Sequence, residues 1–159
     1  MLLTELPLGL PGRVFRSPMP FSQYDPQGNA LREYRTNKIA LIVLLAEAEE
    51  CIARASRDLR AFYLREGFQV LPLPIVDFGV PTKDTLEEAI TKVVGYAQAG
   101  RHIAVHCHAG IGRTGLFAAS LAKRVLGLSG EQAIEWVRRY IPEAVENAAQ
   151  RQLVMGDGA

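Results

Sequence analysis

HIAVHCHAGIGRTG, residues 102–115, is the most informative segment in this chain of 159 residues. Its first four residues are mostly apolar and predict a buried strand, whereas the apolar and alanine-rich residues 116–122 predict a helix. A strand that turns through glycines into a helix gathers backbone N–H groups around one point at the helix N-terminus. The pattern therefore predicts a site for a phosphate-like dianion.

The residue types in this loop suit chemistry on a phosphate group. Cys107 stands at the start of the loop, where N–H donors and the helix dipole stabilise a thiolate, the nucleophilic form of the side chain. Gly110 and Gly112 let the backbone turn its amides inward. Arg113 offers a planar set of donors that can grip two phosphate oxygens. Thr114 places a hydroxyl where it can hydrogen-bond the sulfur.

The loop matches the pattern His-Cys-x5-Arg-Ser/Thr from His106 to Thr114. It resembles the active-site motif of the cysteine-dependent protein tyrosine phosphatase superfamily. The resemblance implies that Cys107 is the nucleophile and that Arg113 is a second catalytic residue. The residues expected to bind the phosphate of the substrate are His108, Ala109, Gly110, Ile111, Gly112 and Arg113. We expect His106 to be buried and, with Thr114, to support the loop.

A second stretch, PIVDFGVP at residues 74–81, resembles the mobile general-acid loop of the same superfamily. The resemblance implies that Asp77 is the catalytic acid. An Asp before Gly-x-Pro is also a common turn residue, but the strand predicted just before it and its spacing to Cys107 favour the acid. Residues 13–18 and 39–45 resemble the opening of small dual-specificity phosphatases, so the similarity extends over roughly the whole chain.

Length and composition indicate one domain. The chain is long enough for a single core and short for two, and 48% of its residues are hydrophobic. We therefore expect one catalytic domain over residues 1–159. No stretch looks like the phosphotyrosine-recognition loop of the larger classical members, which favours the compact dual-specificity type.

The charge balance and the cysteine count limit the possible partners and location. A net charge of +1 argues against broad electrostatic binding to nucleic acid or membranes. No apolar run approaches the roughly 18 residues of a membrane span, and the N-terminus lacks the basic start of a secretory signal. Two cysteines make no disulfide framework, and a reactive thiolate suits a reducing cytoplasm. We expect a cytoplasmic monomer that needs no cofactor and acts on phosphorylated proteins or peptides.

Hydrophobic periodicity predicts alternating strands and helices. The continuously apolar run at residues 39–45 predicts a central parallel strand that is covered on both sides. Strands are predicted at residues 13–16, 39–45, 68–73 and 102–105. Helices are predicted at residues 46–65, from Thr82 or Thr85 to Gly100, and at residues 113–126, 129–140 and 147–155. The proline-rich first forty residues otherwise predict loop. The expected fold class is α/β: a single domain with a central, mainly parallel sheet and helices on both faces.

Three alternating histidines raise the question of a metal site. His102, His106 and His108 would share one face of an extended strand. No carboxylate or second cysteine lies at ligand spacing near them, so no metal site is predicted. We expect His108 to be an exposed residue near the rim of the cleft.

Three further features allow two interpretations each. Cys51 is predicted to be a buried helix residue that packs on the sheet. Some members of the superfamily protect an oxidised nucleophile by a disulfide to a second cysteine, so the resemblance also allows a Cys51–Cys107 bond. Gln150 and Gln152 resemble a C-terminal glutamine segment that approaches the active site in some relatives, although most exposed helix glutamines have no catalytic role. A solvated helix face is predicted for the arginines Arg54, Arg57, Arg60 and Arg65.

The leading hypothesis is hydrolysis of a phosphomonoester through a phosphocysteine intermediate, on phosphotyrosine and also on phosphoserine or phosphothreonine in proteins. The alternative is a phosphoinositide or inositol polyphosphate phosphatase, which shares the loop. Members that act on such anionic rings often carry lysines within it, where this chain has His108, Ala109 and Ile111. A phosphate-binding module without catalysis usually lacks the cysteine, the arginine or the acid. Cys107, Arg113 and Asp77 are all present here, which argues against that class. The position of the arginine and the Asp77 stretch also argue against a rhodanese-type sulfurtransferase.

Overall fold

Four parallel strands direct their carboxyl ends to one edge of the sheet. The computed structural model describes residues 1–156 and contains a five-stranded sheet in the order β1-β2-β5-β3-β4. β1 runs antiparallel to β2, and the other neighbouring strands are parallel. The strands are β1 (Thr4–Leu6), β2 (Val14–Ser17), β3 (Ile39–Leu44), β4 (Gln69–Pro72) and β5 (His102–His106).

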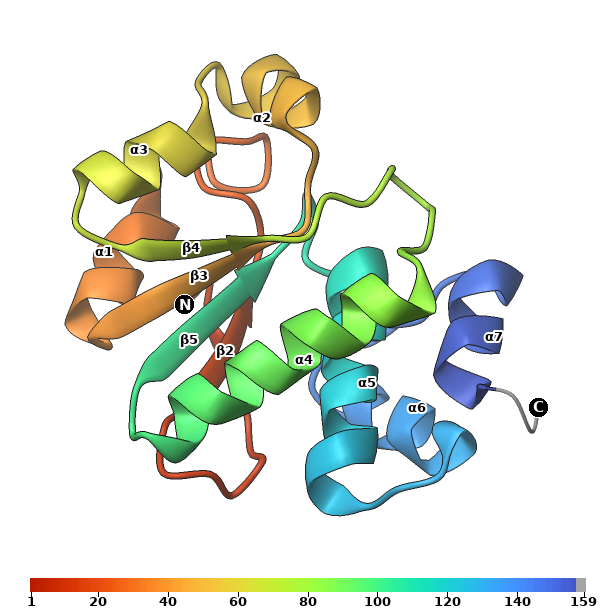
Figure 1. The fold of residues 1–159 in the computed structure, drawn as a ribbon. Helices are drawn as coiled ribbons and strands as arrows, with labels where there is room; N and C mark the ends of the chain where they lie inside the picture. Colours follow the sequence, from red (N-terminus) through yellow and green to blue (C-terminus); the bar gives the residue numbers. More distant parts are fainter. Residues whose placement is uncertain (157–159) are drawn as a thin grey trace.

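Helices cover both faces of this sheet (Figure 1). One face carries α1 (Asn29–Thr36), α2 (Ala48–Ala55) and α3 (Leu59–Arg65). The other face carries α4 (Lys83–Gln98), α5 (Gly112–Leu126), α6 (Gly130–Arg138) and α7 (Ala148–Met155). The predicted α/β class, with a mainly parallel sheet and helices on both faces, is confirmed.

The side chains of β3 alternate between the two cores. Leu41 and Val43 belong to the core under α4 to α7, whereas Ile42 and Leu44 belong to the core under α1 to α3. Consecutive side chains of a strand point to opposite faces, so a strand that is buried on both faces must be apolar throughout. The position of β3 between β5 and β4 confirms the prediction of a central covered strand.

The prediction for the first forty residues missed β1 and α1. The start of α1 is held by Asp25, whose carboxylate accepts hydrogen bonds from the backbone N–H groups of Asn29 at 2.8 Å and Ala30 at 2.9 Å. Tyr34 and Ala30 then bury the inner side of the helix. The prolines before α1 dominated the local pattern, while the helix depends on this cap and on tertiary burial.

The single helix expected at residues 46–65 is wrong, because the chain forms α2 and α3 instead. Ser56 ends α2 in the left-handed region, with φ of 56°. Asp58 caps α3, since its side chain accepts a hydrogen bond from the N–H of Ala61 at 3.2 Å. An aspartate just before the apolar Leu59 is an N-cap signal that the charged, alanine-rich composition concealed.

Other helix boundaries follow the predicted caps. Thr82, not Thr85, is the N-cap of α4. Ser129 and Gln132 form the expected capping box at α6. Gly127 ends α5 with φ of 65°, a left-handed conformation that glycine adopts without strain.

The carboxyl ends of β2, β3, β4 and β5 lead into the segments that build the candidate site. β5 enters the loop at Cys107, β4 enters the segment that carries Asp77, and β3 is followed by α2. In open parallel sheets, ligands bind at this edge. Within the described part of the chain, no helix is both long and apolar enough to cross a bilayer.

Candidate active site

Cys107 lies at the floor of the loop formed by residues 107–113, which we call the cysteine loop. Its side chain is 3% exposed, and Thr114 Oγ1 donates a hydrogen bond to its sulfur at 3.0 Å. Because α5 begins at Gly112, the positive end of the helix dipole lies within the loop. A hydroxyl donor and a helix N-terminus both stabilise a sulfur that carries negative charge.

The backbone carbonyls on the outside of the cysteine loop are held by β2 and by the segment that follows it. The N–H of Met19 donates to the carbonyl of His108 at 2.8 Å. The guanidinium of Arg16 donates from Nη2 to the carbonyls of Ala109 at 2.9 Å and Gly110 at 2.8 Å, and from Nε to Gly110 at 3.1 Å. In a trans peptide the N–H points opposite to the carbonyl, so the next amides along the loop face away from these donors, as an anion site requires.

Gly110 allows this close approach of Arg16. It has φ of 81°, and a Cβ at this position would lie 2.3 Å from Arg16 Nη2. Burial lowers the pKa of Arg16, and the nearby sulfur of Cys107 opposes this effect. Because a guanidinium stays protonated in proteins, Arg16 adds a positive charge directly behind the loop.

Arg113 is held in one orientation by Glu50 of α2. The two side chains form a bidentate pair, with Nη1–Oε1 at 2.7 Å and Nη2–Oε2 at 2.8 Å. Arg113 Nη1 also donates to the carbonyl of Ile75 at 2.8 Å. Burial of Glu50 opposes its ionisation, but the hydrogen bonds and charge of Arg113 outweigh this effect, and its pKa lies below the ordinary value. The pair thus fixes a charged guanidinium beside the cysteine loop.

Asp77 reaches the site from the segment between β4 and α4, residues 73–82, which we call the Asp77 loop. Its Oδ1 lies 3.1 Å from Arg113 Nη2, and its Oδ2 lies 3.4 Å from Arg54 Nη2. Arg54 Nε also lies 3.2 Å from Glu50 Oε2. The carboxyl expected to be the acid therefore stands beside the arginine expected to bind phosphate.

His106 is fully buried behind the cysteine loop, as expected. Tyr63 of α3 shares a hydrogen bond with its Nε2 at 2.8 Å, and its Nδ1 lies 3.0 Å from the carbonyl oxygen of Cys107. Burial lowers the pKa of His106 to about 4, so the ring is neutral at physiological pH. This chain of contacts orients the backbone at the start of the loop.

A cavity of about 200 Å³ opens above the sulfur. Two aromatic side chains line its mouth, Tyr24 at 46% exposure and Phe78 at 64% exposure. Glu146 lines the same mouth, and a Cβ on Gly112 would lie 2.0 Å from its Oε1. Burial and the negative charge of Asp77 raise the pKa of Glu146. The full lining consists of Tyr24, Asp77, Phe78, Cys107, His108, Ala109, Ile111, Gly112, Arg113 and Glu146.

Two of the sequence-based expectations about side chains are wrong. His108 is buried rather than exposed, because the ring of Tyr24 packs against it edge-on with centroids 4.8 Å apart. The arginines of residues 54–65 do not form only a solvated face. Arg54 contacts Glu50 and Asp77, and the guanidinium of Arg57 lies 3.6 Å from the centroid of the Phe21 ring.

The remaining candidates are placed as follows. Cys51 is a buried helix residue, as predicted, and both cysteines are free thiols. Burial raises the pKa of Cys51 to about 11, so it is protonated at neutral pH. Gln150 is fully buried and reaches the Asp77 loop, whereas Gln152 is exposed. His102 lies away from the loop and accepts a hydrogen bond from the N–H of Arg13 at 2.9 Å.

Sequence reasoning missed several residues of the site. Glu50 and Arg54 stand on α2, and Arg16 stands on β2, far along the chain from the residues that they contact. Glu146 belongs to the segment before α7. The spacing of Glu50 and Arg54, four residues apart on one helix face, is the one local signal that they act together.

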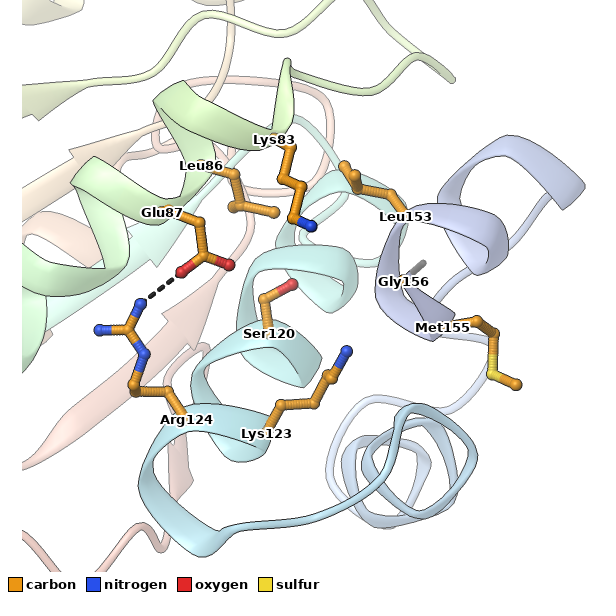
Figure 2. A pocket seen from close by; sticks show the side chains of 9 residues that line it. All are labelled: Lys83, Leu86, Glu87, Ser120, Lys123, Arg124, Leu153, Met155 and Gly156. Atoms are coloured by element: carbon orange, nitrogen blue, oxygen red, sulfur yellow. Dashed lines mark hydrogen bonds and ion pairs between the residues drawn. The ribbon is translucent and has the colours of Figure 1, made fainter. Parts of the chain in front are cut away.

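Figure 2 shows a larger cavity, of about 350 Å³, between α4, α5 and α7. Ser120 and Lys123 project into it from α5, and Arg124 pairs with Glu87 of α4 (Figure 2). Lys123 Nζ also donates to the backbone carbonyl of Val154 at 2.6 Å. Its lining includes no residue of the cysteine loop or of the Asp77 loop. This region is where α7 is attached to α5.

Among residues 1–156, no group of three or more histidine, cysteine or acidic side chains is arranged to hold a metal ion. The polar groups that line the site are instead the sulfur of Cys107, the guanidinium of Arg113 and backbone amides of the loop. The guanidinium and the amide N–H groups suit an anion. A family model described as "polymorphic toxin system, DSP-PTPase phosphatase" matches residues 20–125. The chain belongs to the DSP-PTPase phosphatases.

Known proteins similar to this DSP-PTPase include curated sequences and solved structures. A protein tyrosine phosphatase domain-containing protein 1 from Danio rerio is 38% identical over 46% of the chain and 10% of its own length. The tyrosine-protein phosphatase cdc-14 from Caenorhabditis elegans is 30% identical over 76% of the chain and 16% of its own length. The DSP-PTPase chain thus spans between a tenth and a sixth of the length of these relatives.

Solved structures resemble this DSP-PTPase over nearly its whole length. Tk-PTP in the active form has a TM-score of 0.78 and 26% identity, covering 95% of this chain and 93% of that one. Kinase-associated phosphatase has a TM-score of 0.86 at 21% identity, with 96% and 90% covered. PTPMT1 in complex with PI(5)P has a TM-score of 0.72 at 21% identity, with 89% and 87% covered. The compact protein tyrosine phosphatase fold is therefore confirmed.

Replacing Arg16 with methionine tests the anchoring of the cysteine loop. Hydrogen bonds from a charged donor contribute about 1.5–3 kcal/mol, so we expect kcat/KM of this DSP-PTPase to fall about 10- to 100-fold. Alkylation of Cys107 by iodoacetamide should slow in parallel, because Arg16 holds the loop that surrounds the sulfur. Steady-state kinetics and mass spectrometry of the alkylated protein measure both effects.

The matched control for this prediction is Arg13→Met. Arg13 precedes the same strand but pairs with the exposed Glu5, and neither touches the cysteine loop. This variant should keep normal kinetics. Equal effects of the two substitutions would show that the carbonyl contacts of Arg16 do not organise the loop.

Proposed function

We propose that this phosphatase hydrolyses phosphomonoesters through a phosphocysteine intermediate. The thiolate of Cys107 attacks phosphorus, and a sulfur–phosphorus bond forms as the bond to the leaving oxygen breaks. Asp77 gives its proton to that oxygen. Water then attacks the phosphocysteine while Asp77 takes a proton from it, and inorganic phosphate and the thiolate are released. The loop amides and Arg113 stabilise the phosphoryl oxygens in both steps.

The observation that carries this proposal is the meeting of three groups at one cavity. The sulfur of Cys107, with its hydrogen bond from Thr114, lies at the floor, and Arg113 and Asp77 stand 3.1 Å apart beside it. A sulfur nucleophile, an oxyanion binder and a proton donor are the groups that the two steps need. Every step uses side chains of this chain, so the proposal requires no cofactor.

We propose phosphotyrosine in proteins as the preferred substrate, with slower action on phosphoserine and phosphothreonine. The rings of Tyr24 and Phe78 at the mouth of the cavity support this choice. Aromatic side chains pack favourably against another aromatic ring, here the phenol ring of a phosphotyrosine substrate. Burial and the charge of Arg54 lower the pKa of His108, which disfavours a positive charge on its ring. Together with the carboxyl group of Glu146 at the mouth, this disfavours highly anionic inositol phosphates.

We further propose that the enzyme acts as a monomer in a reducing cytoplasm. Both cysteines are free thiols, and the reaction needs Cys107 reduced. Phosphorylated proteins or peptides are the partners that follow from the substrate.

The test of substrate class compares kcat/KM for a phosphotyrosine peptide, the same peptide with phosphoserine, and a soluble inositol phosphate. We expect the phosphotyrosine peptide to be the best substrate. Tyr24→Ala should lower its kcat/KM by up to about tenfold, since an aromatic contact is worth about 0.5–1.5 kcal/mol. The phosphoserine peptide should lose less, because it has no ring to pack.

Tyr24→Phe is the control for this prediction, because it keeps the ring and removes only the hydroxyl. It should retain the preference for phosphotyrosine. A wild-type enzyme that hydrolyses the inositol phosphate fastest would reject the proposed substrate class and favour the alternative from the sequence. Vanadate should inhibit the release of phosphate from each substrate that is hydrolysed through Cys107.

A further inference from the structure

The Asp77 loop is tied to α7 by two side-chain amides. Asn147 Nδ2 donates to the carbonyl of Phe78 at 2.8 Å, and Gln150 Nε2 donates to the carbonyl of Gly79 at 3.3 Å. These carbonyls belong to the two residues that follow Asp77. The contacts therefore act on the backbone immediately beside the carboxyl group.

The backbone at this point needs such support. Phe78 has φ of 63°, in the left-handed region that a bulky side chain rarely adopts, and its ring is mostly exposed. Little apolar packing thus holds the residue in its conformation. A strained residue persists only where the surrounding structure specifies it. The N–H of Gly79 donates to the carbonyl of Val76 at 2.7 Å within the loop, and the hydrogen bonds from α7 add support from outside it.

Both amides are themselves fixed by their oxygen atoms. Asn147 is the N-cap of α7, and its Oδ1 accepts from the N–H of Gln150 at 2.9 Å. Gln150 is fully buried, and its Oε1 accepts from the N–H of Glu146 at 3.0 Å. Each amide therefore uses its oxygen to hold the start of α7 and its nitrogen to hold the Asp77 loop.

The far end of α7 is attached to α5, the helix that begins within the cysteine loop. Lys123 of α5 donates to the carbonyl of Val154 at 2.6 Å, in the region that Figure 2 shows. Gly130 of α6 packs so closely on α7 that a Cβ would lie 2.7 Å from Met155 Cα. α7 is thus a fixed support between the helix of the cysteine loop and the Asp77 loop.

We propose that Asn147 and Gln150 are positioning residues that hold Asp77 where it protonates the leaving group. The inference rests on the proposed role of Asp77 as the acid. It assigns a role to Gln150, which the sequence left open, and none to Gln152. It also predicts a specific kinetic signature, because proton donation matters most when the leaving oxygen is strongly basic.

The experiment compares kcat/KM for phenyl phosphate, whose leaving group is basic, with that for difluoromethylumbelliferyl phosphate, whose leaving group is weakly basic. The variant is Asn147→Ser. Serine keeps an N-cap acceptor for α7 but is too short to reach the carbonyl of Phe78. We expect a loss of about tenfold on phenyl phosphate, as for one hydrogen bond, and of about twofold or less on the other ester.

Gln152→Ala is the matched control, since this exposed glutamine lies on the same helix. It should leave both rates unchanged, and thermal melting should show all three proteins folded. Equal losses on the two esters, or no loss on either, would overturn the positioning role. Wild-type protein that hydrolyses neither ester in a Cys107-dependent way would instead refute the proposed function, so the two failures are distinguishable.

Discussion

Cys107→Ser should lower kcat by roughly 10⁴-fold or more, as the loss of an enzyme nucleophile does. A serine hydroxyl is a far weaker nucleophile than a cysteine sulfur at the N-terminus of a helix. The partners of the site remain in the variant, because Arg113 is held by Glu50 and the loop carbonyls are held by Arg16. Phosphopeptide binding should therefore be retained. Steady-state kinetics and calorimetric titration with a phosphotyrosine peptide measure the two properties.

Cys51→Ala provides the matched control for the nucleophile. Cys51 is buried on α2, and burial raises its pKa to about 11, so it has little thiolate with which to react. This variant should keep its activity in a reducing buffer. Full activity of Cys107→Ser, or phosphorus found on another residue after rapid quenching, would exclude the phosphocysteine mechanism.

The cysteine loop could be predicted from sequence because its parts are contiguous. Strand, glycines and helix follow one another within fourteen residues, 102–115, and each local preference agrees with the final structure. His106 and Thr114 were assigned correct positions for the same reason. Each has one partner within the loop itself, the carbonyl oxygen of Cys107 for His106 and the sulfur of Cys107 for Thr114. The other partner of His106, Tyr63 of α3, is distant in sequence and was not predicted.

The second layer of the site could not be predicted in this way. Glu50 binds Arg113 across 63 positions of the chain, and Arg16 binds Gly110 across 94. Such pairs exist because parallel strands bring the ends of distant segments to one edge of the sheet. Hydrophobic periodicity predicts which face of a helix or strand is buried. It does not predict which distant group a buried or half-buried charged side chain will bind.

The error at His108 has the same origin. A loop residue beside a cleft is exposed on average, yet here the ring of Tyr24 covers it from a segment that follows β2. The prediction that residues 1–40 are mostly loop left this segment without a position. Correct placement of Asp25 as the support for α1 would also have brought Tyr24 toward the mouth of the cavity.

Glu50 and Asp77 share the same arginine but differ in what each can do. Both carboxylate oxygens of Glu50 accept hydrogen bonds from Arg113, and the pKa of Glu50 lies below the ordinary value, so Glu50 is ionised at neutral pH. Asp77 is a third exposed and makes a single contact to that arginine. A carboxylate that is permanently ionised orients a guanidinium, whereas a proton donor must be able to exist in its acid form. We therefore propose that Glu50 orients Arg113 and that Asp77 serves as the acid.

Asp77→Asn should lower kcat/KM for phenyl phosphate by about 100- to 10,000-fold, the usual contribution of a general acid. The amide keeps the size of the side chain and a polar contact to Arg113, so the substitution removes the proton and little else. The loss should shrink for difluoromethylumbelliferyl phosphate, whose leaving oxygen departs without a proton. Steady-state rates on the two esters measure both effects.

Asp84→Asn, on the exposed first turn of α4, controls for the loss of one negative charge near the loop and should keep the wild-type rates on both esters. An Asp77→Asn enzyme with the wild-type rate on phenyl phosphate would place the acid elsewhere. Glu146 would then be the next residue to substitute, because it is the other carboxyl group that lines the cavity and burial raises its pKa.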